Sequence, residues 1–468
     1  MSDITRLSVA QQGAAIKAGK ISPVELTKAY LARIDAYNRK VNAFVTPTPE
    51  LALKEAKAAE AAVRRGDWRG PLHGIPIGQK DLYRTKGVRT TCASRLLKRH
   101  VPKEDATVVA RYKAAGTVLL GKLNTHEFAY GPTNDSSCFG PARNPWDLTR
   151  FTGGSSGGSG AAVALDLCAG ATGSDTGGSI RIPSSACGIT GIKPTYGRAS
   201  RAGIFPLCWS MDHPGPMAHS VEDCAILLQP IVGRDPRDPT TVDRPIPDYR
   251  AALAGGIKGL KIGLPKHYFY DRSLPVVEKA VLKAVDVLKS LGASVHVVSI
   301  PHIDYAAAAA TTMYLCEAAA YHDDVIGTKG DAFTEQVRLY VELGNYVLAK
   351  DYLHAQRFRS LLGQEVAAVL ETVDVLALPT LPITAQTLGK ESITIRGKPD
   401  AVFGALIRNT EPFNLTGLPV VSVPCGFDED GMPIGLSIVG RPFDEAQILK
   451  VGHAYQHETD WHKRRPKL

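Results

Sequence analysis

The feature that most constrains the fold of this chain is a stretch rich in glycine, serine and alanine between Thr152 and Arg181. It opens with TGGSSGGSGAA, continues through an apolar run at 161–171, and closes with GSDTGGSIR. Glycine accepts backbone conformations and close approaches that a Cβ atom forbids. A flexible Gly/Ser linker would not continue into AAVALDLCAGA or repeat its serine and glycine chemistry after it. We therefore expect a buried site that presents hydroxyl and backbone N–H groups to a ligand.

Other glycine-rich motifs fit this stretch less well. The phosphate-binding loop GxxxxGK[ST] is absent, because no Gly-Lys pair in the chain is followed by Ser or Thr. The dinucleotide-binding fingerprint needs a third glycine at the position that Val163 occupies. The run 153–157 matches GxSxG, the nucleophile elbow of α/β-hydrolases, but that elbow follows a buried strand. The preceding WDLTRFT is not such a strand, so the elbow is the less favoured alternative.

Length and composition predict an ordinary globular protein. Of the 468 residues, 44% are hydrophobic and 22% are charged, as in typical soluble domains. The net charge is +9, but the basic residues are dispersed except in the last few residues, so no nucleic-acid-binding face is expected. The eight cysteines form no CxxC pair, which argues against a structural zinc site. With no signal-peptide pattern and no long apolar run, we expect a reduced, cytoplasmic protein that needs no metal, cofactor or membrane.

Short apolar runs alternate with helical patterns, which is typical of an α/β fold. Ser22-Pro23-Val24-Glu25 combines an N-cap, a proline at the first helical position and a capping glutamate, and predicts a helix to about Tyr37. Further helices are expected at 49–65, 104–115, 276–291, 351–370 and 444–455, and strands at 74–82, 117–120, 261–264, 295–300, 373–378, 420–423 and 434–439. We therefore predict a mixed central β-sheet covered by helices on both faces. We expect one domain over 1–468, with a semi-independent lobe at about 240–410 as the alternative.

Lys80, Ser155 and Ser179 are the candidate catalytic residues. Hydrolysis of an unactivated carbonyl needs a nucleophile, a base and hydrogen-bond donors aimed at the developing oxyanion. Ser179 offers a hydroxyl, and the N–H groups of 176–179 can converge because two glycines let the backbone turn tightly. A buried lysine can act as the base, since burial lowers its pKa. From these residues alone, a surface lysine at the end of a strand remains an equal alternative for Lys80.

The chain closely resembles the amidase signature family, the Ser–Ser–Lys hydrolases, over most of its length except about 235–410. The matching segments are GIPIGQKDL (74–82), TKGVRTT (85–91), HEFAYG (126–131), FGPARNPWD (139–147), TGGSSGGSGAAVA (152–164), GSDTGGSIRIPSSACGITGIKPTYGRASRAGIFPL (173–207), DHPGPMAHSVEDCAILL (212–228), FNLTGLPVVSVPCG (413–426) and PIGLSIVGRPF (433–443). The resemblance implies the amidase signature fold, with the segment at about 240–410 shaping the substrate site.

The resemblance also implies a role for each candidate. Ser179 is expected to be the acylated nucleophile, Ser155 the bridging serine after a cis peptide bond, and Lys80 the base. The oxyanion hole is expected from the segment Thr176, Gly177, Gly178 and Ser179, and the loop is expected to be braced by Asp175 and Arg181.

Five further serines in this part of the chain are expected to have no catalytic role. We interpret them as loop hydroxyls that bond the local backbone. They are Ser156, Ser159, Ser174, Ser184 and Ser185.

The expected reaction is hydrolysis of carbon–nitrogen bonds through an acyl-enzyme, with esters and carbamates also within reach of such a site. Phe205, Leu207 and Trp209 follow the matched core and predict an apolar pocket wall, although they can also be ordinary core residues. We therefore expect a stand-alone amidase for small hydrophobic or aryl amides, acting as a monomer or homodimer with no nucleic acid. The alternative is the amidase component of a glutamine-dependent aminoacyl-tRNA amidotransferase complex, which passes ammonia to its partners.

Overall fold

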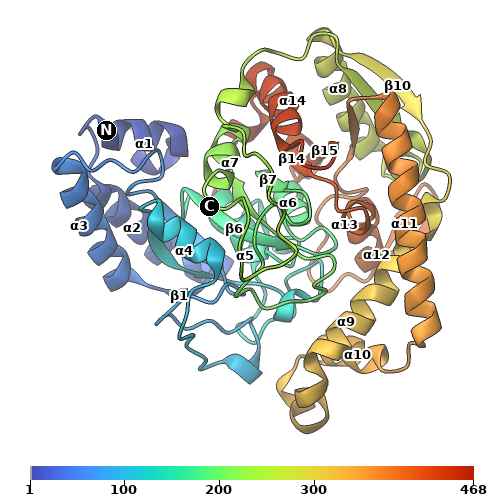
Figure 1. Ribbon diagram of the computed structural model, residues 1–468, viewed down its shortest axis with the longest axis horizontal. Helices are drawn as coiled ribbons and strands as arrows, with labels where there is room; N and C mark the ends of the chain where they lie inside the picture. The colour runs from blue at the N-terminus through green and yellow to red at the C-terminus, as the bar shows by residue number, and fades with distance from the viewer. Residues whose placement is uncertain (1–2) are drawn as a thin grey trace.

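The computed structural model of the chain describes residues 3–468 (Figure 1). Within these residues the α-helices are α1 (Val9–Lys17), α2 (Pro23–Val41), α3 (Pro49–Arg64), α4 (Thr107–Ala114), α5 (Gly157–Ala164), α6 (Arg181–Cys187), α7 (Val221–Leu228), α8 (Pro275–Ser290), α9 (Ala306–Lys329), α10 (Glu335–Gly344), α11 (Ala349–Thr372), α12 (Val402–Arg408), α13 (Pro412–Leu415) and α14 (Glu445–Glu458). The strands are β1 (Phe44–Pro47), β2 (Pro76–Lys80), β3 (Val118–Leu123), β4 (Arg143–Asn144), β5 (Asp147–Phe151), β6 (Gly170–Asp175), β7 (Thr190–Lys193), β8 (His213–Ala218), β9 (Lys261–Pro265), β10 (Ser294–Val298), β11 (Val375–Pro379), β12 (Ser392–Ile395), β13 (Lys398–Ala401), β14 (Val420–Phe427) and β15 (Pro433–Val439).

Helix α2 begins where the sequence predicts it because its capping residues act together. The Ser22 hydroxyl accepts the N–H groups of Val24 and Glu25, and the Glu25 carboxylate accepts the N–H of Ser22. The helix continues to Val41, beyond the expected end, and stops at Asn42 in the left-handed conformation with φ of 50°. Asparagine is one of the few residues that adopts this conformation readily, so it ends the helix as a glycine would.

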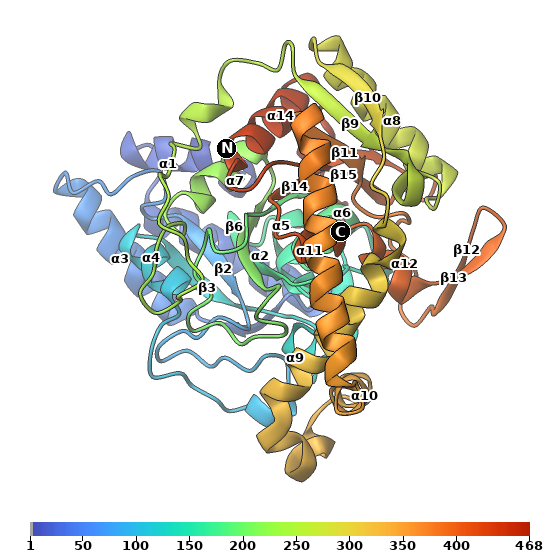
Figure 2. The ribbon, with the colours of Figure 1, turned by 45° about the vertical axis from the view of Figure 1, so that its right-hand side comes forward.

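An 11-stranded sheet runs through the molecule in the order β1-β3-β2-β6-β8-β7-β14-β15-β11-β9-β10. Strand β2 is parallel to β3 and β6, and β9 is parallel to β10 and β11. The strands between these two parallel groups pair antiparallel. The predicted mixed central sheet is therefore confirmed. Two short ribbons, β4–β5 and β12–β13, lie outside it, and the second projects from the body in Figure 2.

Helices cover both faces of this sheet, as predicted. Val421 and Val423 on β14 face Gly452 of α14, since a Cβ at Gly452 would lie 3.5 Å and 3.6 Å from their methyl carbons. Successive side chains of a strand point to opposite faces. Ser422 therefore lies on the other face, next to its β15 partner Ser437. Helix α6 covers that second face, because Gly435 lies two residues before Ser437 on β15 and a Cβ there would lie 2.6 Å from the Ser185 hydroxyl oxygen of α6.

The region at about 240–410 supplies strands β9, β10 and β11, which extend the same sheet. Its long helices α9 and α11 pack against each other at the right of Figure 1. The sequence predicted α11 but not α9, whose alanine-rich pattern shows no strong apolar face. Strands β6 and β8 were not predicted either, because GATGSD has Thr172 as its single β-branched residue and HPGPMA has none of Val, Ile, Thr, Phe, Tyr or Trp.

Among residues 3–468, no helix has both the length and the hydrophobicity needed to cross a membrane.

Candidate active site

The candidate site lies at one edge of the parallel part of the sheet. Lys80 is the last residue of β2, and Asp175 is the last residue of β6. These strands are parallel neighbours, with Ile77 opposite Gly170, so their carboxyl ends meet at the same edge. In α/β sheets this edge is where loops gather around ligands. The loop 176–180, which carries Ser179, leaves β6 at this point.

Lys80 is completely buried and held between two serines. Its Nζ lies 2.7 Å from Ser155 Oγ and 2.8 Å from Ser174 Oγ. Burial lowers the pKa of Lys80 to about 7, although Asp175 and Asp212 act in the opposite direction. A lysine with this pKa is partly uncharged at neutral pH. It can therefore accept a proton, which an ordinary surface lysine cannot do.

Ser155 enters the site through an unusual backbone. The peptide bond between Gly154 and Ser155 is cis, as the family resemblance implied. The strand before it, β5, is partly exposed and lies outside the central sheet, where it pairs with β4 and forms a bridge from Arg150 to Thr387. The nucleophile elbow of α/β-hydrolases needs a buried strand at this place. That alternative is therefore not supported by the fold around Ser155.

The loop after β6 is shaped by two glycines that have no room for a side chain. Gly178 has φ of +136°, and a Cβ there would lie 2.2 Å from Thr410 Oγ1. A Cβ at Gly177 would lie 2.5 Å from the hydroxyl oxygen of Tyr314. The backbone N–H groups of Gly177, Gly178 and Ser179 donate no hydrogen bond to another part of residues 3–468. These donors are available to an anionic oxygen in the neighbouring cavity.

A buried ion pair fixes this loop to the C-terminal part of the chain. The Arg181 guanidinium donates to Asp175 over 2.8 Å and 2.9 Å, to Thr410 O over 2.8 Å and to Asn414 Oδ1 over 2.6 Å. Asn414 Nδ2 in turn donates to the Asp175 carboxylate over 2.8 Å. Burial alone would raise the pKa of Asp175, but Arg181 holds it well below its usual range. Asp175 therefore stays ionised and keeps its partners.

Three of the other serines contact backbone carbonyls, as interpreted, but Ser159 and Ser184 lie in helices α5 and α6 and not in loops. Ser159 and Ser184 donate to backbone carbonyls at 2.8 Å and 2.7 Å, and Ser156 contacts the Ser174 carbonyl at 3.3 Å. Ser174 differs, because its hydroxyl accepts the second hydrogen bond from Lys80. The sequence did not indicate the contact between Ser174 and Lys80, because the glycine-rich composition of β6 does not predict a strand at Ser174.

Of the three candidate catalytic residues, Ser179 lines an open cavity. This cavity has a volume of about 330 Å³, and its lining includes Ser179 but neither Lys80 nor Ser155. Within residues 3–468 no hydrogen bond joins the Ser155 and Ser179 hydroxyls, although Ser156 N–H donates to Ser179 O over 3.3 Å. The structure thus places Lys80 directly against Ser155, and Ser179 in the adjacent loop facing the cavity. Catalytic hydrogen bonds are often completed only when the substrate binds.

The cavity is mostly apolar and aromatic, with one acid in its wall. Its aromatic side chains are Tyr130, Tyr314, Tyr340 and Phe403. The acid is Glu411, which the sequence analysis did not single out. Its only sequence signal is a carboxylate between neutral residues in the run NTEPFNLTG.

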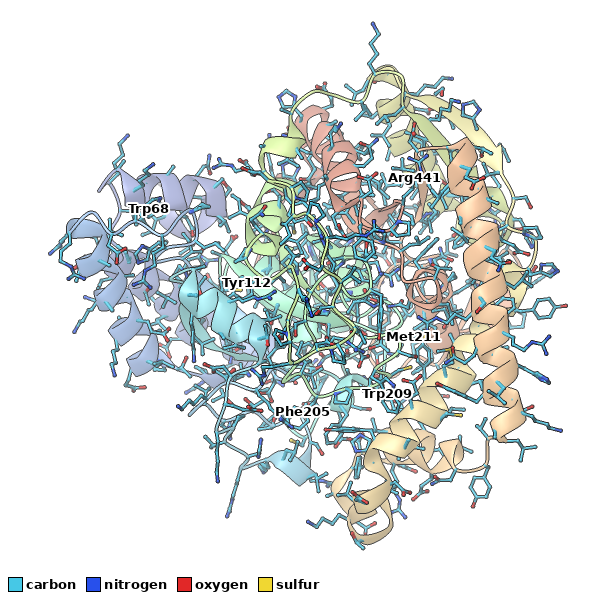
Figure 3. The ribbon with its side chains drawn as sticks, viewed as in Figure 1. Trp68, Tyr112, Phe205, Trp209, Met211 and Arg441 are labelled. Carbon is cyan, nitrogen blue, oxygen red and sulfur yellow. The ribbon has the colours of Figure 1, made fainter. Side chains whose placement is uncertain are left out.

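Two of the three side chains that the sequence assigned to the pocket wall lie elsewhere. Leu207 lines the cavity of Ser179, but Phe205 and Trp209 line a second cavity of about 250 Å³. The Arg84 guanidinium lies 5.1 Å from the centre of the Phe205 ring, and Trp209 is 46% exposed. Figure 3 shows Trp209 beside α9, where its neighbour Ser210 bonds Glu317. The predicted apolar wall is therefore wrong for these two aromatic residues.

Comparison with known proteins identifies the family. The family model named Amidase matches residues 25–449. The chain belongs to the amidase family. Among its curated relatives, the A subunit of glutamyl-tRNA(Gln) amidotransferase from Roseiflexus sp. strain RS-1 is 46% identical, over 100% of this chain and 99% of the relative.

Solved structures agree with this assignment. One is described as an unexpected vestigial protein complex that reveals the evolutionary origins of an s-triazine catabolic enzyme. A chain of it is 37% identical to this amidase, with a TM-score of 0.94, covering 99% of this chain and 100% of that one. The A subunit of glutamyl-tRNA(Gln) amidotransferase from Thermotoga maritima is 34% identical, with a TM-score of 0.83, covering 100% and 98%.

These relatives correct the expected function. A stand-alone enzyme for hydrophobic or aryl amides was inferred largely from the run 203–213, whose aromatic residues do not face the nucleophile. Curated relatives that are 44–46% identical over 98–100% of this chain are instead amidotransferase A subunits, which favours the alternative. The expectation of a monomer or homodimer without nucleic acid is wrong on the same finding, because those relatives are named as subunits of an enzyme that acts on a tRNA.

Proposed function

We propose that this chain is the amide-hydrolysing component of a glutamyl-tRNA(Gln) amidotransferase, with glutamine as the nitrogen source. The observation that carries the proposal is identity of 46% with the A subunit of such an enzyme over the full length of both chains. The site is consistent with it, since a buried lysine, two serines and free backbone N–H groups adjoin a cavity of a size suited to a small amide.

In the proposed reaction Ser179 Oγ attacks the amide carbon of the substrate. The proton of Ser179 passes to Ser155 as Ser155 gives its own proton to uncharged Lys80. The negative charge on the amide oxygen is stabilised by the N–H groups of the segment 176–179. The C–N bond then breaks, the protons return along the same path to the nitrogen, and ammonia leaves an acyl-Ser179.

Water completes the cycle by the same route. It attacks the acyl carbon while Ser155 and Lys80 accept its proton, and Ser179 leaves as the restored hydroxyl. Glutamate is released, and ammonia passes to partner subunits that amidate the glutamyl group on the tRNA. Asp175 and Arg181 act by holding the loop and not by touching the substrate. We place this reaction in the cytoplasm, where aminoacyl-tRNA is made.

The test is reconstitution of the transamidation reaction. The chain is co-expressed with the other amidotransferase subunits encoded by the same genome, and conversion of glutamyl-tRNA(Gln) to glutaminyl-tRNA(Gln) is measured with glutamine and ATP. We expect conversion with wild-type chain and none when the chain is omitted.

The Ser179→Ala variant separates amide hydrolysis from the later steps. Conversion with glutamine should fall by about a thousandfold or more, whereas conversion with ammonium chloride should persist, because free ammonia bypasses the acyl-enzyme. Failure of the wild-type chain to support conversion with any set of partners, together with failure to associate with them, would refute the proposal.

A further inference from the structure

Among residues 3–468, the lining of the Ser179 cavity includes Glu411 and no Asp, His, Lys or Arg. The other lining residues are aliphatic, aromatic, glycine, proline or hydroxyl-bearing. Glu411 is fully buried, and neither carboxyl oxygen has a hydrogen-bond partner in this part of the chain. Buried carboxyl groups are normally paired or hydrogen-bonded, so an unpaired one beside a nucleophile calls for an explanation.

No group within residues 3–468 neutralises this acid. Arg408 is the cation whose charge lowers the pKa of Glu411, but its guanidinium forms an ion pair with Asp400. The hydroxyl of Tyr268, whose pKa Glu411 helps to raise, is also buried without a partner. Burial raises the pKa of Glu411 to about 8, with Arg408 opposing the shift only in part. A positively charged ligand group would lower the pKa of Glu411 again, because it would stabilise the carboxylate.

We propose that Glu411 is a specificity-determining residue that binds an ammonium group of the amide substrate. The inference rests on the proposed function and deepens it, because glutamine carries such a group. The cavity lining holds no lysine or arginine within the described residues to pair with the glutamine carboxylate. The substrate class for this cavity is therefore a short aliphatic amide with an amino group, recognised by its ammonium and not by its carboxylate.

Three small amides test this preference without requiring turnover. γ-Aminobutyramide is glutamine without its carboxylate, glutaramate is glutamine without its ammonium, and butyramide lacks both. Their binding is measured by titration calorimetry to full-length Ser179→Ala protein, which cannot hydrolyse them. We expect γ-aminobutyramide to bind at least about tenfold more tightly than the other two, the size of effect that one charge-assisted contact supplies.

The Glu411→Gln substitution in the same background tests the residue itself. The advantage of γ-aminobutyramide over butyramide should shrink to about twofold or less. Glu317→Gln is the matched control, because Glu317 is also buried but is bonded to Ser210 and Tyr352 and lies outside the cavity lining. It should leave the ratio of the two affinities unchanged.

Two results would overturn the inference, and neither depends on the proposed function. One is equal or tighter binding of glutaramate in the Ser179→Ala protein, which needs no Glu411 variant and is unaffected if that variant misfolds. The other is a ligand ratio that Glu411→Gln leaves intact. If instead the ammonium preference is found but no transamidation can be reconstituted, the proposed function fails while the role of Glu411 stands.

Discussion

Lys80 sets the expected pH dependence at the scale of single residues. Its pKa of about 7 reflects burial, and the proposed base is the uncharged form, which dominates above that pH. The value of kcat/KM for small amides should therefore rise with pH through about 7 and then level off. Lys80→Met should lower kcat/KM by about a thousandfold or more. A pH profile that stays flat from 6 to 9 in the wild-type protein would contradict the assignment.

Ser174 gives a finer test of the same base. Its hydroxyl accepts a hydrogen bond from Lys80 Nζ over 2.8 Å, which favours the protonated lysine. Removing this acceptor by Ser174→Ala should lower the pKa of Lys80 and move the rising limb of the pH profile to lower pH. A purely structural role would lower activity without moving the limb.

Glu411 should leave a signature in the pH dependence of stability. Its pKa is about 8 in the folded protein, above the value of about 4.3 expected in the unfolded chain. When folding raises the pKa of an acid, the unfolded chain releases the proton at a lower pH than the folded protein does. The free energy of unfolding therefore falls as pH rises from about 4 to about 8. Glu411→Gln removes the ionisation, so its melting temperature minus that of wild type should increase between pH 5 and 8 and then stay constant. A difference that does not change with pH would contradict an unpaired, protonated Glu411.

The sequence named candidate site residues but not the contacts around them. Lys80, Ser155 and Ser179 were predicted from motifs in which glycines and hydroxyls recur at short range, and the structure places Lys80 against Ser155 and Ser179 in the adjacent cavity wall. The sequence did not predict that Ser174 bonds Lys80, because this contact depends on β6 lying beside β2. The two residues are 94 positions apart in the sequence. Glu411 was missed because an isolated acid carries no signal until the fold places it in a cavity wall.

At the scale of elements, the loop between β6 and α6 depends on the absence of a side chain at Gly178. Gly178→Ala would force an L residue into φ of +136° and bring its Cβ within 2.2 Å of Thr410 Oγ1. We expect kcat to fall by about a hundredfold or more, since the N–H donors beside it would be displaced. Steady-state kinetics on small amides measures this.

Gly431→Ala is the control for the backbone conformation alone. Gly431 has φ of +77° and lies in the β14–β15 turn, where a Cβ would have no atom within 4 Å. This substitution should lower the melting temperature slightly and leave kcat unchanged. Equal losses of kcat in both variants would show that the positive φ at the substituted residue, and not the contact with Thr410, lowers kcat.

Strands were predicted correctly where the local apolar pattern agrees with the burial of the strand in the central sheet. Strands β9, β11, β14 and β15 are apolar runs, and each begins within two residues of its predicted start. Strand β8 was missed because His213–Ala218 contains two prolines, and its place is fixed by pairing with both β6 and β7. Neighbouring strands therefore override a composition that disfavours a strand.

At the scale of the whole molecule, sequence motifs predicted the type of reaction but not whether the chain acts alone or with partner subunits. The family resemblance implied the same roles for Lys80, Ser155 and Ser179 in a stand-alone hydrolase and in an amidotransferase component, so local motifs did not separate these two expectations. The distinction came from identity over the full length, and the run 203–213 pointed the wrong way because its aromatic residues line another cavity. A fold and its site chemistry do not by themselves define a function.

The whole chain is expected to unfold as one unit. The region at about 240–410 provides β9, β10 and β11, and β11 pairs antiparallel with β15 from the C-terminal part. Arg359 of α11 also donates to the carbonyls of Leu415 and Ser210, which lie outside that region. Because these links join the region to the common sheet, we expect a single cooperative transition, with calorimetric and van 't Hoff enthalpies that agree.

Gly263→Ala tests this from within the region. Gly263 lies in β9, and a Cβ there would lie 2.8 Å from a methyl carbon of Leu376 on β11, so the substitution should destabilise the far end of the sheet. If the chain is one domain, the whole transition should move to lower temperature, and far-ultraviolet circular dichroism and tryptophan fluorescence should report the same midpoint. A semi-independent lobe would instead give a second, earlier transition that alone responds to the substitution, while the transition of the catalytic part stays in place.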